Sequence, residues 1–186
     1  MTNGMRVKQL FVVCFLVCPA LAILTRADDV NGSQACHLPK AAEAVLWEKL
    51  RGWSIVTESD LTEHNRVLWK AKHTRVCPGV AAGDYFGTRN PGYAITLIKH
   101  EATGTLQTLV MLKPNGHSYE LIEIGKPQET SRALVLFKLG PGVFEDIETG
   151  EKVKSSRESV AFEDIAAGML VYTWRNGKFK EIQVSE

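Results

Sequence analysis

The side chains best suited to hydrolytic chemistry are concentrated in two short acidic stretches. Glu145, Asp146 and Glu148 form the first, and Glu163 with Asp164 forms the second. Two carboxylates that face each other across a cleft can hydrolyse a glycosidic bond, with one acting as acid and the other as base or nucleophile. These stretches give one hypothesis, a hydrolase that acts on cell-envelope polymers through surface carboxylates. The competing interpretation is that adjacent acids beside turns are solvated and take no part in catalysis.

The sequence lacks the short motifs of the common enzyme classes. It has no Gly-x-Ser-x-Gly elbow, no phosphate-binding Gly-x-x-x-x-Gly-Lys loop and no His-Glu-x-x-His zinc motif. Its five histidines, at positions 37, 64, 73, 100 and 117, lie in or next to polar runs, which is typical of surface residues. The sequence therefore favours a non-enzymatic protein over an enzyme.

Cys36 and Cys77 are the two cysteines downstream of the N-terminal apolar segment, which itself contains Cys14 and Cys18. Two cysteines in an exported domain most simply form one disulfide. The alternative is a metal site completed by His37 or His73, although these residues lack the close ligand spacing of a zinc motif. We therefore predict a disulfide between Cys36 and Cys77 and no metal.

The N-terminus has the pattern of a secretory signal. Arg6 and Lys8 come first, and Leu10 to Ala22 follows as thirteen residues without a charge. A basic start, a short apolar segment and a small-x-small end are typical of a cleavable signal peptide. Cleavage after Ala22 or after Ala27 fits this rule, so residues 1–27 are predicted to be the signal. The apolar run is shorter than the roughly 20 residues of a spanning helix, so we expect no stable membrane span after its removal.

Charge and length limit the possible partners. The whole chain has 22 basic and 21 acidic residues, and residues 1–27 contain three of the basic ones and no acid. The remaining chain therefore has 19 basic and 21 acidic residues, a formal charge of −2. Nucleic-acid binders show a clustered basic face, so we expect no nucleic acid as partner. The remaining length is enough for one domain with its own core.

The stretch from Gly83 to Ala94 carries a family likeness. It reads Gly-Asp-Tyr-Phe-Gly-Thr-Arg-Asn-Pro-Gly-Tyr-Ala and leads into an apolar run. It resembles a degenerate FG-GAP repeat, the integrin α-type propeller unit, whose pattern is Gly-Asp-Phe-Asp-Gly-Asp-Gly-x-x-Asp followed by an apolar strand. The chain also resembles small exported bacterial proteins of unassigned function, which carry one such unit and end in a strand like Val171 to Phe179.

The FG-GAP resemblance implies a loop between strands that holds calcium through several aspartates. Asp84 is the only one of those acids present here, because Phe86, Thr88 and Gly92 occupy the other acidic positions. Calcium takes six to eight oxygen ligands, with several carboxylates among them. We therefore carry over the shape of the loop and predict no cofactor, with Asp84 as the single candidate calcium ligand.

The same loop supplies the candidate contact residues, which are Asp84, Tyr85, Phe86 and Tyr93. If the three aromatic side chains are exposed, they form a contact patch, since tyrosine is common at interface hot spots. The alternatives are that the aromatic side chains pack in the core and that Asp84 caps its own turn.

Two kinds of element are predicted to position these residues. Lys40 to Leu50 is expected to form a helix, with Pro39 at its start and the apolar residues Ala42, Val45, Leu46 and Leu50 on one face. Asp60 to His73 is ambiguous between a helix and a strand over 66–72. The β pattern follows, with predicted strands at Trp53–Val56, Tyr93–His100, Leu106–Lys113, Tyr119–Ile124, Ala133–Leu139, Val143–Ile147, Ser159–Glu163, Met169–Trp174 and Phe179–Val184.

Two Asn-Gly pairs predict the register of two hairpins, because both residues tolerate the positive φ of a type I′ turn. A loop at Asn115-Gly116 places Leu112 opposite Tyr119 and Val110 opposite Leu121, with Leu109, Met111, Ile122 and Ile124 on the other face. Both faces are apolar, so we expect cover on both sides, with the N-terminal helix on one of them. A loop at Asn176-Gly177 pairs Trp174 with Phe179 and Val171 with Ile182.

The sequence thus predicts an α+β fold with one or two N-terminal helices packed on an antiparallel, hairpin-rich β-sheet. The expected domain spans residues 40–186, after the signal peptide of residues 1–27 and a loose segment of residues 28–39. The expected function is that of an exported binding module of the periplasm or cell envelope, for example an inhibitor or an immunity-type protein. Its partner would be a protein that contacts the Gly83–Gly92 loop and the neighbouring hairpin tips. The hydrolase hypothesis is the alternative.

Overall fold

The computed structural model describes residues 36–74 and 76–185, which all belong to one compact unit. The predicted signal peptide, residues 1–27, lies outside the described residues, as does most of the segment 28–39. Its last residues are anchored, because Cys36 forms a disulfide and Leu38 is buried under the first helix. No helix in the described part of the chain is long and apolar enough to cross a membrane.

Two α-helices precede most of the strands. The first, α1 (Lys40–Lys49), begins directly after Pro39 and buries Ala42 and Leu46. A short 3-10 turn (Glu58–Asp60) leads to the second, α2 (Glu63–Lys72). The Thr62 hydroxyl accepts a hydrogen bond from the Asn65 N–H at 3.3 Å and so caps the start of α2. This cap explains why the ambiguous segment is a helix and why the strand alternative is wrong.

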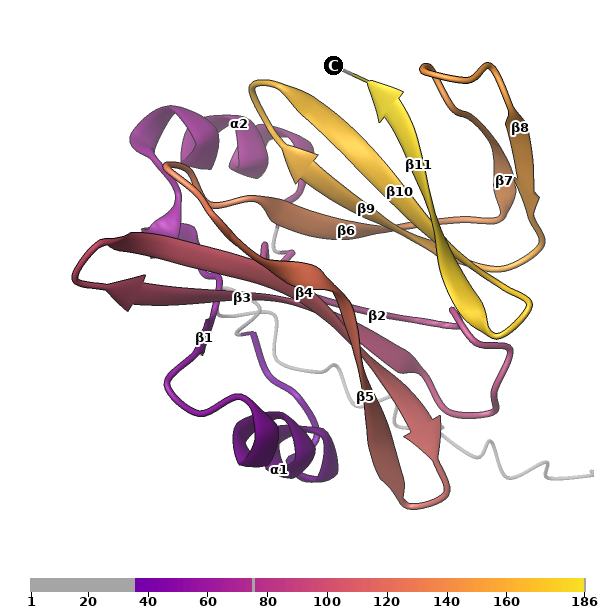
Figure 1. The fold of residues 1–186 in the computed structure, drawn as a ribbon, viewed down its shortest axis with the longest axis horizontal. Coiled ribbons are helices and arrows are strands. Elements are labelled where there is room, and N and C mark those ends of the chain that lie inside the picture. Colours follow the sequence, from indigo (N-terminus) through magenta and orange to yellow (C-terminus); the bar gives the residue numbers. More distant parts are fainter. Residues whose placement is uncertain (1–35, 75, 186) are drawn as a thin grey trace, which may run out of the picture. The chain divides into compact units, whose positions relative to one another are not determined.

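Eleven strands form three antiparallel sheets in the described chain (Figure 1). The first sheet contains β1 (Ser54–Ile55), β2 (Val80–Gly83), β3 (Gly92–Glu101), β4 (Gly104–Asn115) and β5 (Ser118–Glu129). The second contains β6 (Val135–Leu139), β9 (Ser159–Asp164), β10 (Gly168–Arg175) and β11 (Lys178–Ser185). A separate hairpin pairs β7 (Gly142–Glu145) with β8 (Lys152–Ser155). The α+β class with an antiparallel, hairpin-rich architecture is confirmed, with several sheets in place of one.

The terminal hairpin has the predicted register, since Trp174 lies opposite Phe179 and Val171 opposite Ile182. The β4–β5 hairpin has the predicted faces but a partner shift of two residues, so that Leu112 lies opposite Leu121. Asn115 remains in the strand and pairs with Ser118, and Gly116 alone has a positive φ, of 61°. A positive φ at the first of two central residues fits a type II′ turn over 116–117.

Apolar residues on both faces of the first sheet explain the layering. Leu46 of α1 packs with Ile95 and Leu97 of β3 on one face, which confirms the helix as cover. On the other face, Leu109 and Met111 of β4 pack against Leu136, Val160 and Tyr172 of the second sheet. The hairpin β7–β8 covers the outer face of the second sheet through Val153, Phe144, Val171 and Ile182.

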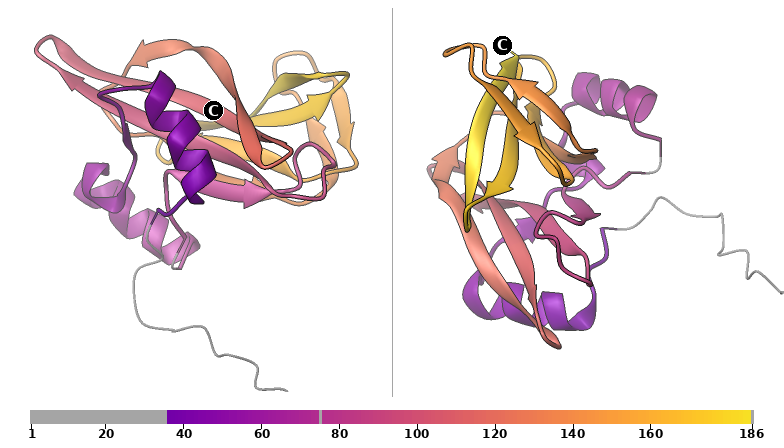
Figure 2. Two further views of the ribbon diagram at one scale, coloured as in Figure 1. Left: turned by 90° about the horizontal axis from the view of Figure 1, so that it is seen from below. Right: turned by 90° about the vertical axis from the view of Figure 1, so that its right-hand side faces the viewer.

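The two large sheets meet along one side and are separate along the other (Figures 1 and 2). On the closed side, the Leu136 N–H of β6 donates to the Pro78 carbonyl oxygen, just before β2, at 2.9 Å. On the open side, the last strands of the two sheets are β5 and β11, and no β-ladder joins them in the described chain. The two sheets are therefore joined along one side and open along the other. We call the space between the edges of β5 and β11 the open seam.

Candidate functional site

Two adjoining cavities, with volumes of about 430 and 520 Å³, lie along the open seam. Both are lined by Ile124 and Gly125 of β5, Tyr172 of β10 and Glu181 of β11. We call the two cavities together the seam groove. The two cavities follow each other along β10, from Met169 to Trp174, so the groove is elongated in the strand direction. An elongated groove beside a strand edge suits an extended chain.

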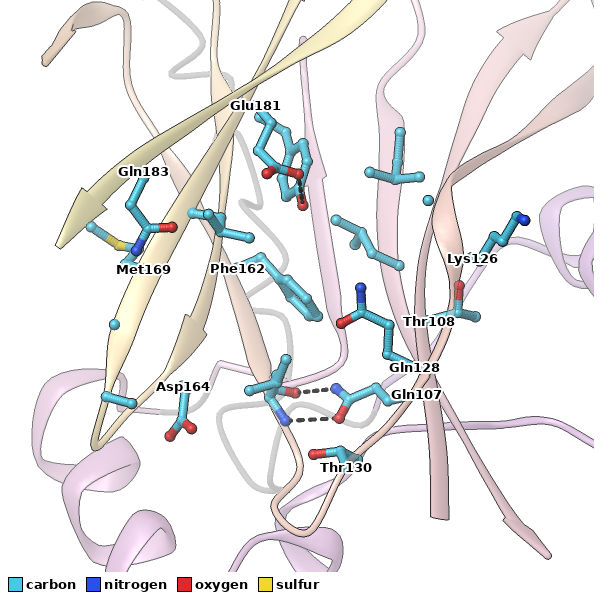
Figure 3. Close-up of a pocket in the computed structure, with 18 of the residues that line it drawn as sticks. Gln107, Thr108, Lys126, Gln128, Thr130, Phe162, Asp164, Met169, Glu181 and Gln183 are labelled. Atoms are coloured by element: carbon cyan, nitrogen blue, oxygen red, sulfur yellow. Dashed lines mark hydrogen bonds between the residues drawn. The ribbon is translucent and has the colours of Figure 1, made fainter. Parts of the chain in front are cut away.

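The first cavity has an apolar floor and a polar rim. Leu109, Phe162 and Leu170 line its floor. Figure 3 shows Phe162 and Gln128 projecting into the cavity from the two facing sheets. Apolar floors with a few placed polar groups are the usual composition of binding sites.

Gln107 fixes one wall of this cavity. Its amide nitrogen donates to the Leu134 carbonyl oxygen at 2.8 Å, and its amide oxygen accepts from the Leu134 N–H at 3.0 Å (Figure 3). Gln107 is buried, so these bonds hold the segment before β6 against β4 with its polar groups satisfied. The wall is consequently formed before any ligand arrives.

Tyr172 and Glu181 lie opposite each other at the centre of the seam groove. The Tyr172 hydroxyl donates to Oε2 of Glu181 at 2.8 Å (Figure 3). Burial, and then the hydrogen bond and negative charge of Glu181, raise the pKa of Tyr172 far above its ordinary value. The hydroxyl is thus a fixed donor at neutral pH.

The Glu181 carboxylate forms no ion pair within the described part of the chain. Glu181 is exposed, and no Lys, Arg or His nitrogen of residues 36–74 and 76–185 lies within ion-pair distance of it. Two other acids at the groove are paired, since Asp164 contacts Arg132 at 2.9 Å and Glu120 contacts Lys113 at 3.5 Å. Glu181 therefore presents a negative charge at the middle of the groove.

The outer edge of β5 is regular in one half and irregular in the other. Gln107 pairs with Gln128 and Leu109 with Ile124, so Gly125, Lys126 and Pro127 together oppose the single residue Thr108. Gly125 has a φ of 75°, which makes this a glycine bulge. Bulges, lysine and proline are the usual means of blocking an edge strand from pairing. The regular edge is the segment Tyr119–Ile124.

The edge of β11 is partly occupied. The Ile147 N–H, from the loop between β7 and β8, donates to the Gln183 carbonyl oxygen at 2.8 Å. Of the two strands that border the seam, β5 therefore offers the longer stretch of edge that pairs with no second strand in the described chain. The sequence analysis did not predict a site at this edge or at Tyr172 and Glu181. The available signal was the predicted hairpin register, which places the charged Glu181 on the same inward face as Phe179.

The Gly83–Gly92 loop is closed against the rest of the fold. The Asp84 N–H donates to Oε2 of Glu158 at 2.6 Å, and Glu158 also contacts Lys138 at 2.7 Å. These bonds lower the pKa of Glu158, with Lys138 as the larger cause. Asp84 itself is exposed, and the described residues contain no cluster of three His, Cys, Asp or Glu side chains that could hold a metal. The loop, which joins β2 to β3 of the first sheet, is thus also held to Glu158, which directly precedes β9 of the second sheet.

Of the two alternatives for the aromatic residues, exposure is wrong for Tyr85 and Phe86, which are 1 % and 6 % exposed and pack in the core. The Tyr85 hydroxyl donates to the Ala81 carbonyl oxygen at 3.2 Å, and the Phe86 ring packs edge-on against Trp174 at 5.0 Å. The physical reason is that the loop folds inward and brings the Phe86 ring against Gly92. Glycine permits this close approach, since a Cβ at position 92 would lie only 2.5 Å from the ring. These two side chains close one end of the core between the sheets.

Tyr93 lies on the opposite face of the first sheet from Phe86. Its ring packs edge-on against Tyr119 at 5.6 Å, and both are half-buried beside α1. Burial and then the neighbouring Tyr119 raise the pKa of Tyr93. A shallow depression of about 310 Å³ here is lined by these tyrosines, Pro91 of the loop and His117 of the hairpin tip. The four candidate contact residues therefore do not form one patch.

The two acidic stretches are not brought together. Glu145 contacts Lys152 at 3.4 Å within the β7–β8 hairpin, whereas Glu163 contacts Lys72 of α2 at 3.6 Å. These two places lie at opposite ends of the second sheet (Figures 1 and 2). Asp146 accepts the Thr149 N–H at 3.0 Å, and this bond is the main cause of its lowered pKa. Each of these three carboxylates supports local structure.

The disulfide between Cys36 and Cys77 is confirmed, with a distance of 5.3 Å between the two Cα atoms. Because both sulfurs are bonded to each other, they are not available as metal ligands. His73, the other candidate ligand, stacks on Trp69 with 4.2 Å between the ring centroids and also contacts Phe137. Burial lowers the pKa of His73 more than nearby Glu163 raises it.

Comparisons with known proteins give no family for this chain. No family model matches it, and neither the curated proteins nor the solved structures contain one with significant similarity to it.

Proposed function

We propose that this protein is an exported, non-enzymatic binding module that takes an extended segment of a protein partner into the seam groove. The observation that carries this proposal is the open seam itself, where the free edge of β5 borders a groove with an apolar floor. An extended segment that pairs with an exposed strand gains backbone hydrogen bonds from the edge and side-chain contacts from the groove.

The segment Tyr119–Ile124 is the acceptor edge in this proposal. It is regular, it pairs only with β4 in the described chain, and it ends at the Gly125 bulge. A strand added there lies beside the second cavity, whose far wall is formed by Tyr172 and Trp174. The added strand would thus be held between the two sheets.

Export is the second part of the proposal, and two features support it. Residues 1–27 have the pattern of a secretory signal, and Cys36 and Cys77 form a disulfide, which persists in oxidising compartments. The partner is accordingly a protein of the periplasm or cell envelope. The FG-GAP likeness enters the proposal only as the shape of the loop that joins β2 to β3.

Selection from a random peptide library, followed by mapping of amide chemical shifts, tests the binding function. We expect selected peptides to shift the amide resonances of β5, β10 and β11. The substitution Ile124→Lys, which places a charge on the apolar wall of the groove, should abolish this binding. The matched control is Val67→Lys on α2, because Val67 is 63 % exposed and lies outside the residues that line the groove.

Thermal melts of both variants separate loss of binding from loss of fold. If selected peptides bind equally to wild type and to a folded Ile124→Lys variant, the groove is not the binding site. If the shifts cluster instead around Pro91, Tyr93 and His117, the shallow depression there is the contact surface and the proposal is wrong.

A further inference from the structure

We infer that the segment taken into the seam groove carries an apolar side chain and a basic side chain two positions apart. This inference rests on the proposed function and adds the chemistry of the partner to it. It follows from the spacing of two different environments on the wall that faces β5.

The wall opposite β5 presents Phe179 and Glu181 in sequence. They are two residues apart on β11, so they project from the same face of the strand about 6.6 Å apart. Alternate side chains of a strand added to β5 have the same spacing and also point to one face. Two consecutive groove-facing side chains of the partner therefore meet the Phe179 environment and the Glu181 environment in turn, whichever way the segment runs.

The Phe179 environment is aromatic. The rings of Phe179 and Trp174 lie edge to face with 4.9 Å between their centroids, and both are half-buried and line the groove. Ile122 of β5 lines the same cavity. An aliphatic or aromatic side chain entering here is enclosed by apolar surface on both sides, which favours burial of apolar area.

The Glu181 environment attracts a cation. One carboxylate oxygen is held by the Tyr172 hydroxyl, and no cation of the described chain neutralises the group. The apolar side chains of Ile124 and Leu170 line the approach to it. A lysine or arginine of the partner covers this apolar surface with its aliphatic stem and places its charge at Glu181.

The reverse arrangement is disfavoured by Lys178. Lys113, whose ammonium lies 5.6 Å from the centroid of the Trp174 ring, is paired with Glu120, whereas Lys178 lines the same cavity and forms no ion pair among the described residues. A basic side chain placed at Phe179 would meet the Lys178 charge, and like charges brought together weaken binding. The groove therefore distinguishes which of the two partner positions carries the charge.

Synthetic peptides test this inference directly. The parent probe is an acetylated eight-residue peptide of alternating threonine and valine, with a leucine and a lysine two positions apart on one face. A second peptide has glutamate in place of the lysine, and a third has glutamine. A fourth carries the lysine one position further along, so that it points away from the leucine. Affinity is measured by titration calorimetry, and the site by amide chemical shifts of β5 and β11.

The leucine–lysine peptide should bind most tightly and the glutamate peptide most weakly. Glu181→Gln, which keeps an acceptor for Tyr172, should weaken binding of the lysine peptide by roughly threefold and leave the glutamine peptide unchanged. Glu145→Gln is the matched control, since Glu145 is an exposed carboxylate of the β7–β8 hairpin.

The possible failures are distinguishable. If all four peptides shift β5 with equal affinity, or the glutamate peptide binds best, the apolar–basic pattern is wrong while strand addition stands. If none of the peptides shifts the amide resonances of β5 at millimolar concentration, strand addition is refuted. The apolar–basic pattern, which rests on strand addition, is then refuted as well.

Discussion

The hydroxyl of Tyr172 donates a 2.8 Å hydrogen bond to the carboxylate of Glu181, its direct partner across the β10–β11 ladder. This pair lies where the two cavities of the seam groove meet. It holds a charged group in place beside the apolar side chains of Ile124 and Leu170, and it gives the groove a centre with a defined chemistry.

The coupling between these two side chains is measurable. We expect Tyr172→Phe and Glu181→Ala, which each remove one partner of the bond, to lower the free energy of unfolding, and the double variant to lose less than the sum of the two. A coupling of about 1.5 kcal/mol is at the lower end of the range for one hydrogen bond to a charged group, as expected for an exposed carboxylate. Urea unfolding of the wild type, the two single variants and the double variant measures this coupling energy. A coupling of zero would mean that the bond contributes nothing to holding Glu181.

The disulfide should be a main source of stability. Cys36 and Cys77 are 41 positions apart, and closing a loop of this length restricts the unfolded chain by about 4 kcal/mol in the entropy model. We expect the double variant Cys36→Ser/Cys77→Ser to lose a stability of this order in denaturant unfolding. Reduction of the wild-type protein should reproduce the loss, and reductant should not affect the variant. An unchanged unfolding midpoint after reduction would contradict this expectation.

Gly92 is required by close packing. A Cβ at this position would lie 2.5 Å from the Phe86 ring and 3.2 Å from the Leu112 carbonyl oxygen. Gly92→Ala should therefore destabilise the fold by about 1–3 kcal/mol through overpacking. The control is Gly140→Ala, because a Cβ there meets no atom within 4 Å and Gly140 does not have a positive φ. Equal melting temperatures for the two variants would show that the loop does not pack as described.

His73 should make stability depend on pH. Its ring stacks on Trp69 and contacts Phe137, and the charged groups that face it are Glu163 of β9 and Lys72 of α2. Its pKa is lowered on folding, so below about pH 6.5 the unfolded chain binds more protons than the folded one. The contribution of His73 is therefore complete above that pH and is lost as the pH falls through the folded pKa.

The measurement for His73 is the free energy of unfolding between pH 5 and 7.5, compared with His73→Phe, which preserves the ring stacking. We expect the wild type to lose more stability than the variant on acidification. If the two pH profiles are parallel, or if the wild type gains stability relative to the variant at low pH, the folded pKa of His73 is not lowered.

The elements that local patterns define were predictable from the sequence. The terminal hairpin has its predicted register because Asn176 and Gly177 both adopt the positive φ of a type I′ turn, at 49° and 79°. For the same pair at Asn115-Gly116, the predicted register is wrong by two residues, because Asn115 remains in the strand and pairs with Ser118. The faces were nevertheless right, because a shift of two preserves the alternation of side chains.

The candidate site was not predictable, because it depends on contacts between distant segments. The seam exists because the segment before β2 bonds to β6, whereas β5 and β11 do not pair, and no local pattern encodes that arrangement. Phe86 illustrates the same limit. Its glycine-rich surroundings are typical of an exposed loop, yet three aromatic side chains, Tyr85, Trp174 and Phe179, enclose its ring.

Amide hydrogen exchange of β5, with and without a saturating peptide from the library selection, tests the central claim most directly. An edge strand that gains a neighbour gains backbone hydrogen bonds, so alternate amides within Tyr119–Ile124 should exchange more slowly when the peptide is bound. The amides of the α1 and α2 helices should keep their rates. Unchanged exchange across Tyr119–Ile124 at saturation would contradict strand addition at the seam.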